Sequence, residues 1–588
     1  MPGKIKKQII IKQHPSEIID HISESIPCSK IVATLLANRG IIDKHQLLKF
    51  IHSSVQNLQS PFGLKDIDLA VKRIIHALEK NENILIFGDY DVDGITATSM
   101  LLEFFKLLGM KIPEFYIPDR LKEGYGLQVY HVQNIAVPKH IHLIITVDNG
   151  SSSVDAVRYS KQLGIDVIIT DHHEMPEVIP DAVAIVNPKQ KECQSGLHYL
   201  SGAGVAFYLI IALRKALRDK DFWKYSKEPS LTSFYDLVAL GTMADIVPLI
   251  SENRILTLAG LQNIRQKNTR IGVDALLDVS KTKAEFTSSS DLVFKLAPRL
   301  NAAGRMAHAR LAVELMTTWD TLKARDIADS LNQLNMQRKN YQEKILKEIR
   351  EYLEIKQPRL LNKRTIVLAS AGWHPGVVGI VASQLVELYA RPVVLVSCEG
   401  ADGRGSARSI SGVSMYKALA ACKHHFEKFG GHEMAGGFTI KTKNLSMFQS
   451  EFENFVRQHT APEHFIPKCV VDYELNFSDI TPSFIEDIEK LEPFGAHNPE
   501  PLFLTKSIRV EESVIVLGRH RKMVLSQEGS HFKNAMQFNC DNINDTSQQF
   551  EHVIFHLSWD RWKHEKKPLL ILADAQSTST DLSSLNIC

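Results

Sequence analysis

The chain has 588 residues, of which 44% are hydrophobic and 23% are charged, and its formal net charge is +2. This length exceeds what a single hydrophobic core supports, so we expect about three to four domains. The small net charge excludes a generally basic nucleic-acid-binding chain, so any nucleic-acid surface must come from local clusters of Lys and Arg.

Cysteine usage and hydropathy indicate the compartment. The seven cysteines are scattered without a CxxC pair, which argues against a disulfide framework or a structural zinc site and for a reducing compartment. Residues 1–7 are basic but lack the apolar core of a signal peptide. No apolar run approaches the ~18–20 residues of a membrane span. We therefore expect a soluble cytoplasmic protein that does not contact a membrane.

The first predicted elements are helices, and a buried strand with an aspartate-rich end follows them. Apolar residues recur at helical spacing in Ile41–His52 and Asp66–Leu78, so residues 1–80 are predicted to be mainly helical. The aliphatic run Ile84–Phe87 then predicts a buried, parallel strand. Three aspartates follow at alternate positions: Asp89, Asp91 and Asp93.

The aspartate triplet lies within Gly88–Thr96 and favours a divalent-cation site. Alternation keeps the side chains on one side of a chain that stays extended. Crowded carboxylates repel one another unless a cation neutralises them, and hard divalent cations take oxygen ligands. Taken alone, the stretch also fits a solvated Asp/Gly-rich turn. A helix is predicted next, from Thr96 to Leu108, with Gly109 as the residue that ends it.

Three more apolar runs, at 143–147, 167–170 and 182–186, alternate with predicted helices. This alternation indicates a parallel sheet with helices on both faces. Two of the runs end in polar groups, which are Asp148 after the first and Asp171, His172 and His173 after the second. Because ligands bind at the C-terminal edge of open α/β sheets, we expect these groups to join the triplet.

Asp245 follows a predicted helix at Phe234–Thr242 and stands in an otherwise apolar run. A lone Asp in such a place fits a helix cap or a further metal ligand. The candidate ligands together mix carboxylate with imidazole, which favours Mn²⁺ over Ca²⁺ and leaves Mg²⁺ possible. Two ions would explain so many ligands.

Residues 297–310 bring three arginines and an amide close together, namely Arg299, Arg305, Arg310 and Asn301. Guanidinium groups suit phosphate oxygens, although a solvated helix end with surface ion pairs fits equally well. One long amphipathic helix is predicted from Asp320 to Glu354, and it would bridge two domains.

A second α/β unit is predicted at about 360–460, with strands at Thr365–Ala369 and Pro392–Ser397 around a helix at Val378–Tyr389. Two Gly-rich segments in this unit carry further candidate ligands for phosphate, namely Arg404, Ser406, Arg408 and His432. Glycines allow a backbone to approach phosphate closely. A flexible hairpin loop is the alternative for the segment with Arg404, Ser406 and Arg408, and a structural role is the alternative for His432.

From about residue 466 short β-like runs replace helices, which predicts a small barrel or sandwich. Stacking aromatics and basic grooves are how OB-type barrels bind single strands. The candidates for such a role are Arg509, Arg519, Arg521, Lys522, Trp559 and Trp562. The same residues fit an ordinary surface and core.

The ordered set of motifs resembles the DHH phosphoesterase superfamily, named for the triplet 171–173, and within it the RecJ family of bacterial single-strand-specific exonucleases. The resemblance covers roughly residues 80–575. It is carried by Gly88–Thr96, Pro118–Gly126, Val147–Gly150, Asp171–His173, Gly241–Leu249, Ala297–Arg305, Gly372–Gly376 and Leu491–Gly495.

The resemblance implies a multidomain α/β fold. It implies a parallel-sheet DHH catalytic domain at 81–315, a linking helix at 316–356, an α/β DHHA1 domain at 357–462 and a C-terminal β-barrel of the OB-fold type at 466–576. A helical segment at 1–80 would precede these domains, and a polar tail at 577–588 would follow them.

The resemblance also implies the activity, which is 5′→3′ hydrolysis of single-stranded DNA to 5′-mononucleotides in recombination and repair. Two divalent cations, Mn²⁺ or Mg²⁺, would activate water. The implied metal ligands are Asp89, Asp91, Asp93, Asp148, His172 and Asp245. The implied contacts to the DNA strand are Arg120, Arg299, Asn301, Arg305, Arg404, Ser406, Arg408 and His432.

Two residues of the triplet 171–173 have roles that the sequence leaves open. Asp171 is expected to orient a neighbouring imidazole, as carboxylates behind metal ligands do. His173 is expected either to bind metal or to steady the scissile phosphate. The resemblance implies a monomer, with a single-strand-binding protein and a RecQ-type helicase as partners.

Other functions are weighed against this hypothesis. Another DHH phosphoesterase would act on short oligonucleotides, and a non-catalytic DNA-binding scaffold would lack the metal carboxylates. The absence of GxGxxG and GxxxxGK[ST] argues against dinucleotide or nucleoside-triphosphate use.

Overall fold

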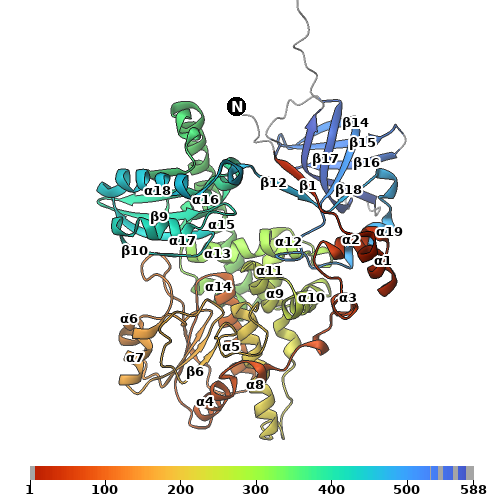
Figure 1. The fold of residues 1–588 in the computed structure, drawn as a ribbon. Coiled ribbons are helices and arrows are strands. Elements are labelled where there is room, and N and C mark those ends of the chain that lie inside the picture. Colours follow the sequence, from red (N-terminus) through yellow and green to blue (C-terminus); the bar gives the residue numbers. More distant parts are fainter. Residues whose placement is uncertain (1–6, 530, 541–546, 561–566, 578–588) are drawn as a thin grey trace, which may run out of the picture. The chain divides into compact units, whose positions relative to one another are not determined.

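The computed structural model describes residues 7–529, 531–540, 547–560 and 567–577, and the chain forms two compact units (Figure 1). The first unit contains Val55–Pro467, and the second contains Gln8–Ser54 together with the chain from Lys468 onward. The helical segment predicted at 1–80 is therefore divided between the units. Among the described residues no helix is long and apolar enough to cross a membrane.

The first sheet of the first unit is parallel throughout and has the strand order β3-β2-β4-β5-β6. Alternate residues of the strands enter different cores: Ile84 and Ile86 pack on one face, whereas Leu85 and Phe87 pack on the other. The strands are β2 (Ile84–Phe87), β3 (Glu114–Tyr116), β4 (Leu143–Val147), β5 (Asp166–Thr170) and β6 (Ala184–Val186).

Helices cover both faces of this sheet, as predicted. The helices α4, α5, α8 and α9 share the larger core, whereas α7 belongs to the smaller one. The helices of this region are α4 (Ile67–Glu79), α5 (Val92–Leu107), α6 (Val129–His131), α7 (Val154–Gln162), α8 (Gly202–Asp219), α9 (Tyr235–Ala244), α10 (Ser251–Arg265), α11 (Ile271–Ser280), α12 (Ser289–Asp291), α13 (Ala297–Met306) and α14 (Arg310–Thr317).

The backbone of the aspartate triplet differs from the prediction. Helix α5 begins at Val92, not at Thr96, because the Asp91 side chain caps it by accepting from the backbone amides of Asp93 and Gly94, at 3.1 and 3.2 Å. The chain therefore does not stay extended through the triplet, and the argument from alternation was wrong. A strand–turn–helix brings the three carboxylates together instead.

The predicted linking helix is α15 (Thr321–Glu351), capped by Asp320. Its first half buries Ala324, Ile327 and Leu331 in the larger core of the parallel sheet. Its second half buries Ile345 and Ile349 in the core of the next domain. A single helix thus contributes to two hydrophobic cores, as the apolar spacing predicted.

The second sheet of this unit has the order β10-β11-β9-β8-β7, and only β7 and β8 are parallel. The Gly-rich segment that was weighed as a flexible loop is the central strand β9, and the next one is the β10–β11 hairpin with His432 in its turn. The elements are β7 (Ile366–Ser370), α16 (Pro375–Tyr389), β8 (Val393–Glu399), β9 (Asp402–Arg408), α17 (Met415–Ala421), β10 (Phe426–Gly431), β11 (Ala435–Lys441) and α18 (Leu445–His459).

The second unit is a closed barrel in the order β14-β15-β16-β18-β17, in which β17 pairs back onto β14. Strand β1 pairs in parallel with β12, so the N-terminal segment is part of this unit. Its elements are β1 (Gln8–Ile11), α1 (Ser16–Ser25), α2 (Lys30–Ala37), α3 (Lys44–Ile51), β12 (Lys468–Val471), β13 (Tyr473–Glu474), α19 (Pro482–Glu489), β14 (Phe503–Val516), β15 (His520–Gln527), β16 (His531–Gln537), β17 (Gln549–Asp560) and β18 (Lys567–Ser577). The predicted fold class is confirmed.

Candidate metal centre and phosphate site

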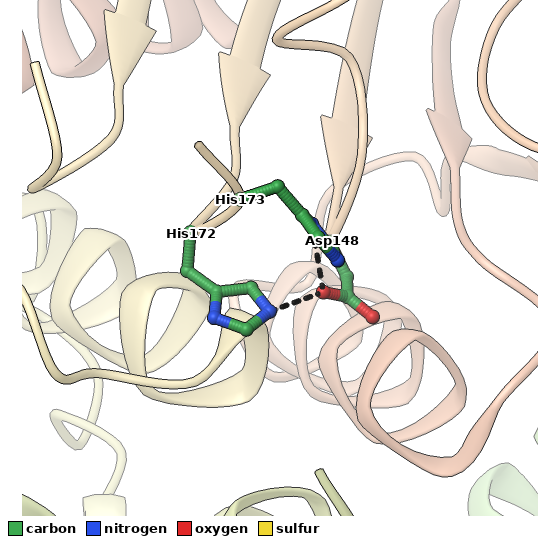
Figure 2. A group of neighbouring side chains, drawn as sticks. All are labelled: Asp148, His172 and His173. Carbon is green, nitrogen blue, oxygen red and sulfur yellow. Dashed lines mark ion pairs between the residues drawn. The ribbon is translucent and has the colours of Figure 1, made fainter. Parts of the chain in front are cut away.

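The carboxyl ends of β2, β4 and β5 bring carboxylates and imidazoles to one place. Figure 2 shows His172 and His173, which follow β5, beside Asp148, which follows β4. His172 Nε2 lies 3.1 Å from Asp148 Oδ1, 3.5 Å from Asp245 Oδ2 and 3.7 Å from Asp93 Oδ2. Asp245 is the C-cap residue of α9 and also lies beside this cluster. Its position therefore fits both a helix cap and a metal ligand, the two alternatives from the sequence.

Ligand atoms gather in three overlapping groups, each with its atoms within 4.8 Å of one another. Asp148 and His172 each belong to two of the groups. The groups are Asp89 with Asp91 and Asp148, Asp93 with His172 and Asp245, and Asp148 with His172 and His173. This arrangement offers more than one position for a cation.

Buried atoms of the cluster form no hydrogen bond within the described part of the chain, although His172 Nε2 and Asp148 Oδ1 lie only 3.1 Å apart. Among the described residues, Asp89 Oδ1, Asp148 Oδ1 and His172 Nε2 are buried without a hydrogen bond. Such atoms are costly unless something else satisfies them. The donor set of carboxylate oxygens and imidazole nitrogen suits Mn²⁺ and Mg²⁺. The residues therefore fit a divalent cation.

Electrostatics point the same way. Burial and neighbouring carboxylates raise the pKa of Asp93 to about 7 and that of Asp245 to about 9. The same causes raise the pKa of Asp89 and Asp148 well above the ordinary Asp value. Burial and the charge of His173 lower the pKa of His172 to about 3. Neutral imidazole is the form of His172 that can bind a metal ion. A bound cation would also offset the repulsion among the neighbouring carboxylates.

The N-terminus of α8 holds Asp93, a contact that the sequence analysis missed. Asp93 accepts from the amides of Gly202 and Ala203, at 2.6 and 2.9 Å. A helix N-terminus is a natural partner for a carboxylate. A Cβ at Gly202 would lie 2.5 Å from Asp148 Oδ1, so only glycine fits there. The segment 201–204, Ser-Gly-Ala-Gly before a helix, was the available signal.

The Asp171 carboxylate accepts several hydrogen bonds and contacts both His172 and His173. Its oxygens accept from the Ser151 amide at 2.9 Å and from the His172 amide at 2.8 Å, and Oδ1 lies 2.8 Å from His173 Nδ1. Although Asp171 is buried, the hydrogen bond and charge of His173 hold its pKa below the ordinary value. In return, Asp171 raises the pKa of His173 to about 9 despite the burial of that imidazole. The hydrogen bond between the two side chains is the contact through which Asp171 could orient His173.

Tyr125 was also missed, although it lies in the segment 118–126 that carried part of the resemblance. Its hydroxyl lies 3.0 Å from His173 Nδ1 and donates to the Asp148 carbonyl oxygen at 3.1 Å. Tyr125 therefore joins the ends of β4 and β5 beside the candidate metal ligands.

A group of arginines adjoins the carboxylates. Burial, together with the charges of Arg120, Arg338 and Arg408, lowers the pKa of Arg305 to about 9, whereas the charge of Asp91 opposes this shift. Arg305 donates to the Gly376 carbonyl oxygen at 3.1 Å. Arg338 was missed, and its Nε is buried without a hydrogen bond among the described residues. Clustered guanidinium groups of this kind suit phosphate oxygens.

The remaining predicted DNA contacts have different surroundings. Arg299 is held by Asn332 Oδ1 at 3.0 Å and by the Lys295 carbonyl oxygen at 2.6 Å. Arg404 donates to the Leu121 carbonyl oxygen. The other positions are Arg120 over the Tyr90 ring at 4.7 Å, Ser406 3.4 Å from Arg408, Asn301 half-buried on α13, and His432 exposed in the β10–β11 turn.

In the barrel unit, two of the residues suggested for strand binding are buried and form hydrogen bonds within the protein. Trp559 is buried and donates to Glu489 at 2.7 Å, and Arg521 is buried and donates to Ser513 at 2.7 Å. Exposed aromatic rings occur at Phe532 and Phe538, which the sequence analysis missed because both lie in strand-like runs. Trp562 lies outside the described residues.

Three family models match the chain. The DHH family N-terminal domain matches residues 83–242, the DHHA1 domain matches 362–458, and the RecJ OB domain matches 471–574. These segments contain the strands β2 to β6, the sheet of β7 to β11, and most of the barrel, respectively.

Curated relatives match over most of the chain. The single-stranded-DNA-specific exonuclease RecJ of Bacillus subtilis is 36% identical over 98% of this chain and 71% of its own length. The protein of the same name from Escherichia coli is 34% identical over 91% of this chain and 93% of its own length.

Solved structures of similar proteins also match the fold of this chain. The crystal structure of RecJ in complex with Mn²⁺ from Thermus thermophilus is 26% identical, with a TM-score of 0.81 over 98% of this chain and 80% of that one. A crystal structure of exonuclease RecJ bound to manganese is 31% identical, with a TM-score of 0.58 over 69% of this chain and 98% of that one.

Proposed function

The chain belongs to the RecJ family of single-stranded-DNA-specific exonucleases, and on that premise we propose how its residues hydrolyse DNA. It is a hydrolase that cleaves phosphodiester bonds of single-stranded DNA with divalent cations. The observation that carries this function is the set of buried atoms of Asp89, Asp148 and His172 that form no hydrogen bond with any described residue and lie at one sheet edge. We further propose that cleavage proceeds 5′→3′ and releases 5′-mononucleotides.

The proposed metal ligands form two groups. Asp89, Asp91 and Asp148 would hold one ion, and Asp93, His172 and Asp245 would hold the other. These are two of the three groups of ligand atoms described above, and they share no residue, which supports two ions. When bound, Mn²⁺ or Mg²⁺ would polarise the scissile phosphate and make a water molecule acidic enough to attack it.

His173 has the proposed role of steadying the phosphate. Its Nδ1 is occupied by Asp171 and Tyr125. Because Asp171 raises the pKa of His173 to about 9, the imidazole holds a second proton at Nε2 near neutral pH. That N–H is proposed to donate to a phosphate oxygen, where developing negative charge is stabilised most.

The arginine group is proposed to hold the phosphates of the strand. Arg120, Arg305 and Arg408 would contact phosphate directly, since an anion relieves the repulsion among their charges. Ser406, whose hydroxyl lies 3.4 Å from Arg408, would add a further contact. Arg299 and Arg404 would order the segments around them through their carbonyl contacts. Asn301 and His432 are proposed as further contacts along the strand.

The cellular setting follows from the family premise. We propose a monomer in the cytoplasm that works in recombination and repair with a single-strand-binding protein and a RecQ-type helicase. The proposed domains are those of the sequence, at 81–315, 316–356, 357–462 and 466–576, with residues 8–54 joined to the barrel unit.

One digestion tests the proposal. A long single strand labelled separately at each end is incubated with the protein and Mn²⁺, and the products are sized. Early release of the 5′ label as a mononucleotide is expected. Early release of the 3′ label would refute the polarity, and cleavage of di- and trinucleotides alone would favour a short-oligonucleotide phosphoesterase.

Two variants belong in the same experiment. Asp91→Ala should bind the strand and release no nucleotide. Asp155→Ala, which removes an exposed carboxylate on α7, should digest the strand like the wild type. Degradation by Asp91→Ala at the wild-type rate would contradict the assigned ligands.

A further inference from the structure

A second cluster of side chains of types that can bind a metal ion lies in the domain of β7–β11, on elements that hold none of the proposed metal ligands. His424 and His425 end η9 (Lys423–His425), a 3-10 turn that leads directly into β10, and Glu451 lies on α18. The Nε2 atoms of His424 and His425 lie 3.0 and 2.8 Å from the same oxygen, Glu451 Oε2. The three ligand atoms lie within 4.8 Å of one another.

The surroundings hold this convergence in place. The two imidazole rings are 4.2 Å apart and tilted by 45°. The buried His425 packs edge-on against Phe448, which lies one turn before Glu451 on the same face of α18. Asn444 Nδ2 donates to the His425 carbonyl oxygen at 3.4 Å. One imidazole is thus fixed, whereas the His424 side chain is 59% exposed and leaves the cluster open to solvent.

The donor set differs from that of the catalytic centre. Two imidazoles and one carboxylate are the ligands of several zinc enzymes, in which water fills the fourth position. Imidazole-rich sites bind Zn²⁺ more tightly than Mn²⁺, whereas carboxylate-rich sites suit Mg²⁺ and Mn²⁺. No cysteine takes part, so this site differs from the cysteine-based zinc site that the sequence argued against.

A simple ion pair uses the same three side chains but needs protonated histidines. Neutral imidazole is the form that binds transition metals. The two interpretations therefore predict different behaviour toward a metal ion.

We propose that His424, His425 and Glu451 bind a Zn²⁺ ion at a site separate from the catalytic centre. The ion would clamp η9 to α18. Since η9 leads into β10, the outer strand of the sheet, the clamp would stabilise the hairpin whose turn carries His432. The expected role is stabilisation of this domain, with no direct part in hydrolysis.

Zinc binding by the full chain tests the proposal. Protein stripped of metal is titrated with ZnCl₂ at about pH 7.5 in excess Mg²⁺, and bound zinc is counted by mass spectrometry after gel filtration. The variant His424→Gln changes an exposed side chain and is not expected to disturb folding. The wild type should retain one more Zn²⁺ per chain than this variant, whose affinity should fall by more than the roughly 10- to 100-fold lost with outer-shell partners.

A matched control separates this site from general imidazole binding. His21→Gln with His45→Gln removes two exposed histidines elsewhere and should bind Zn²⁺ like the wild type. Zn²⁺ should raise the Tm of the wild type and of this control more than that of His424→Gln. Digestion of single-stranded DNA with Mg²⁺ should be equal in all three proteins.

Equal zinc content and equal Zn²⁺-induced Tm shifts in the wild type and His424→Gln would overturn the proposal. Equal loss of zinc in His424→Gln and in the control would overturn it as well. Loss in His424→Gln and in Glu451→Gln, with the control unchanged, is the supporting result.

Discussion

The substitution Gly202→Ala probes the catalytic centre with a single methyl group. The added Cβ would lie 2.5 Å from Oδ1 and 2.7 Å from both Cβ and Cγ of Asp148. Asp148 cannot swing away freely, because its backbone has φ 62° and its amide donates to the Thr170 carbonyl oxygen at 3.0 Å. Helix α8 cannot retreat freely either, because the Gly202 amide donates to Asp93 at 2.6 Å.

The magnitude follows from these distances. Real Cβ contacts stay beyond 3.0 Å, so Asp148 and α8 must separate by at least about 0.5 Å, the difference between 3.0 and 2.5 Å. Overpacking of this kind costs about 1–3 kcal/mol of stability. Misplacement of a catalytic group by about 1 Å costs on the order of 100-fold in rate, so we expect kcat to fall by about 10- to 100-fold.

The assay is digestion of an end-labelled single strand across a range of Mn²⁺ concentrations, with thermal unfolding measured in parallel. Gly63→Ala is the matched control, since its nearest neighbour would be 3.5 Å from the new Cβ and its φ is ordinary. Gly202→Ala should need more Mn²⁺ and turn over slowly, whereas Gly63→Ala should behave like the wild type. Wild-type kcat and Mn²⁺ dependence in Gly202→Ala would refute the placement of α8 against the metal ligands.

Three further predictions concern the same site. Burial raises the pKa of Asp93 to about 7 and that of Asp245 to about 9, so the folded metal-free protein keeps protons that the unfolded chain loses above about pH 4. The stability of the metal-free protein therefore falls as pH rises above about 4, and Mn²⁺ should raise the Tm more at about pH 8 than at about pH 5. Equal Tm shifts at the two pH values would refute the ligand assignment. Asp171→Asn should lower the pKa of His173 from about 9, shift the alkaline limb of the kcat profile to lower pH and reduce kcat, and an unchanged profile would exclude the positioning role. Arg338→Ala should raise KM for single-stranded DNA by about tenfold with little change in kcat, in keeping with the loss of one charged contact, and a wild-type KM would remove Arg338 from the phosphate site.

Much of the fold was predictable because its signals are local. The run Ile84–Phe87 matches β2 residue for residue. An apolar run of this length, bounded by Asn83 and Gly88, is typical of a buried strand and too short for a helix. The linking helix was predictable from its apolar spacing over many turns. The candidate ligands of the metal centre were predictable because strand ends of a parallel sheet share one edge.

Contacts that depend on distant parts of the chain were not predictable. The segment at 8–54 belongs with the barrel through pairing of β1 with β12, and nothing near residue 8 indicates a partner near residue 470. The Asp91 cap moved the start of α5, because a side chain competed with the extended backbone for the same amides. Arg338 lies in a long polar helix face, where only the folded chain shows that it meets Arg305.

Counting bound Mn²⁺ by electron paramagnetic resonance tests the central claim most directly. Asp148 is a proposed ligand of one ion, and its Oδ1 lies 3.1 Å from Nε2 of His172, a proposed ligand of the other. The wild type should bind two Mn²⁺ ions per chain, and Asp148→Asn should lose at least one of them along with hydrolysis of single-stranded DNA. Unchanged Mn²⁺ binding in Asp148→Asn would contradict the assignment of this cluster as the catalytic metal centre.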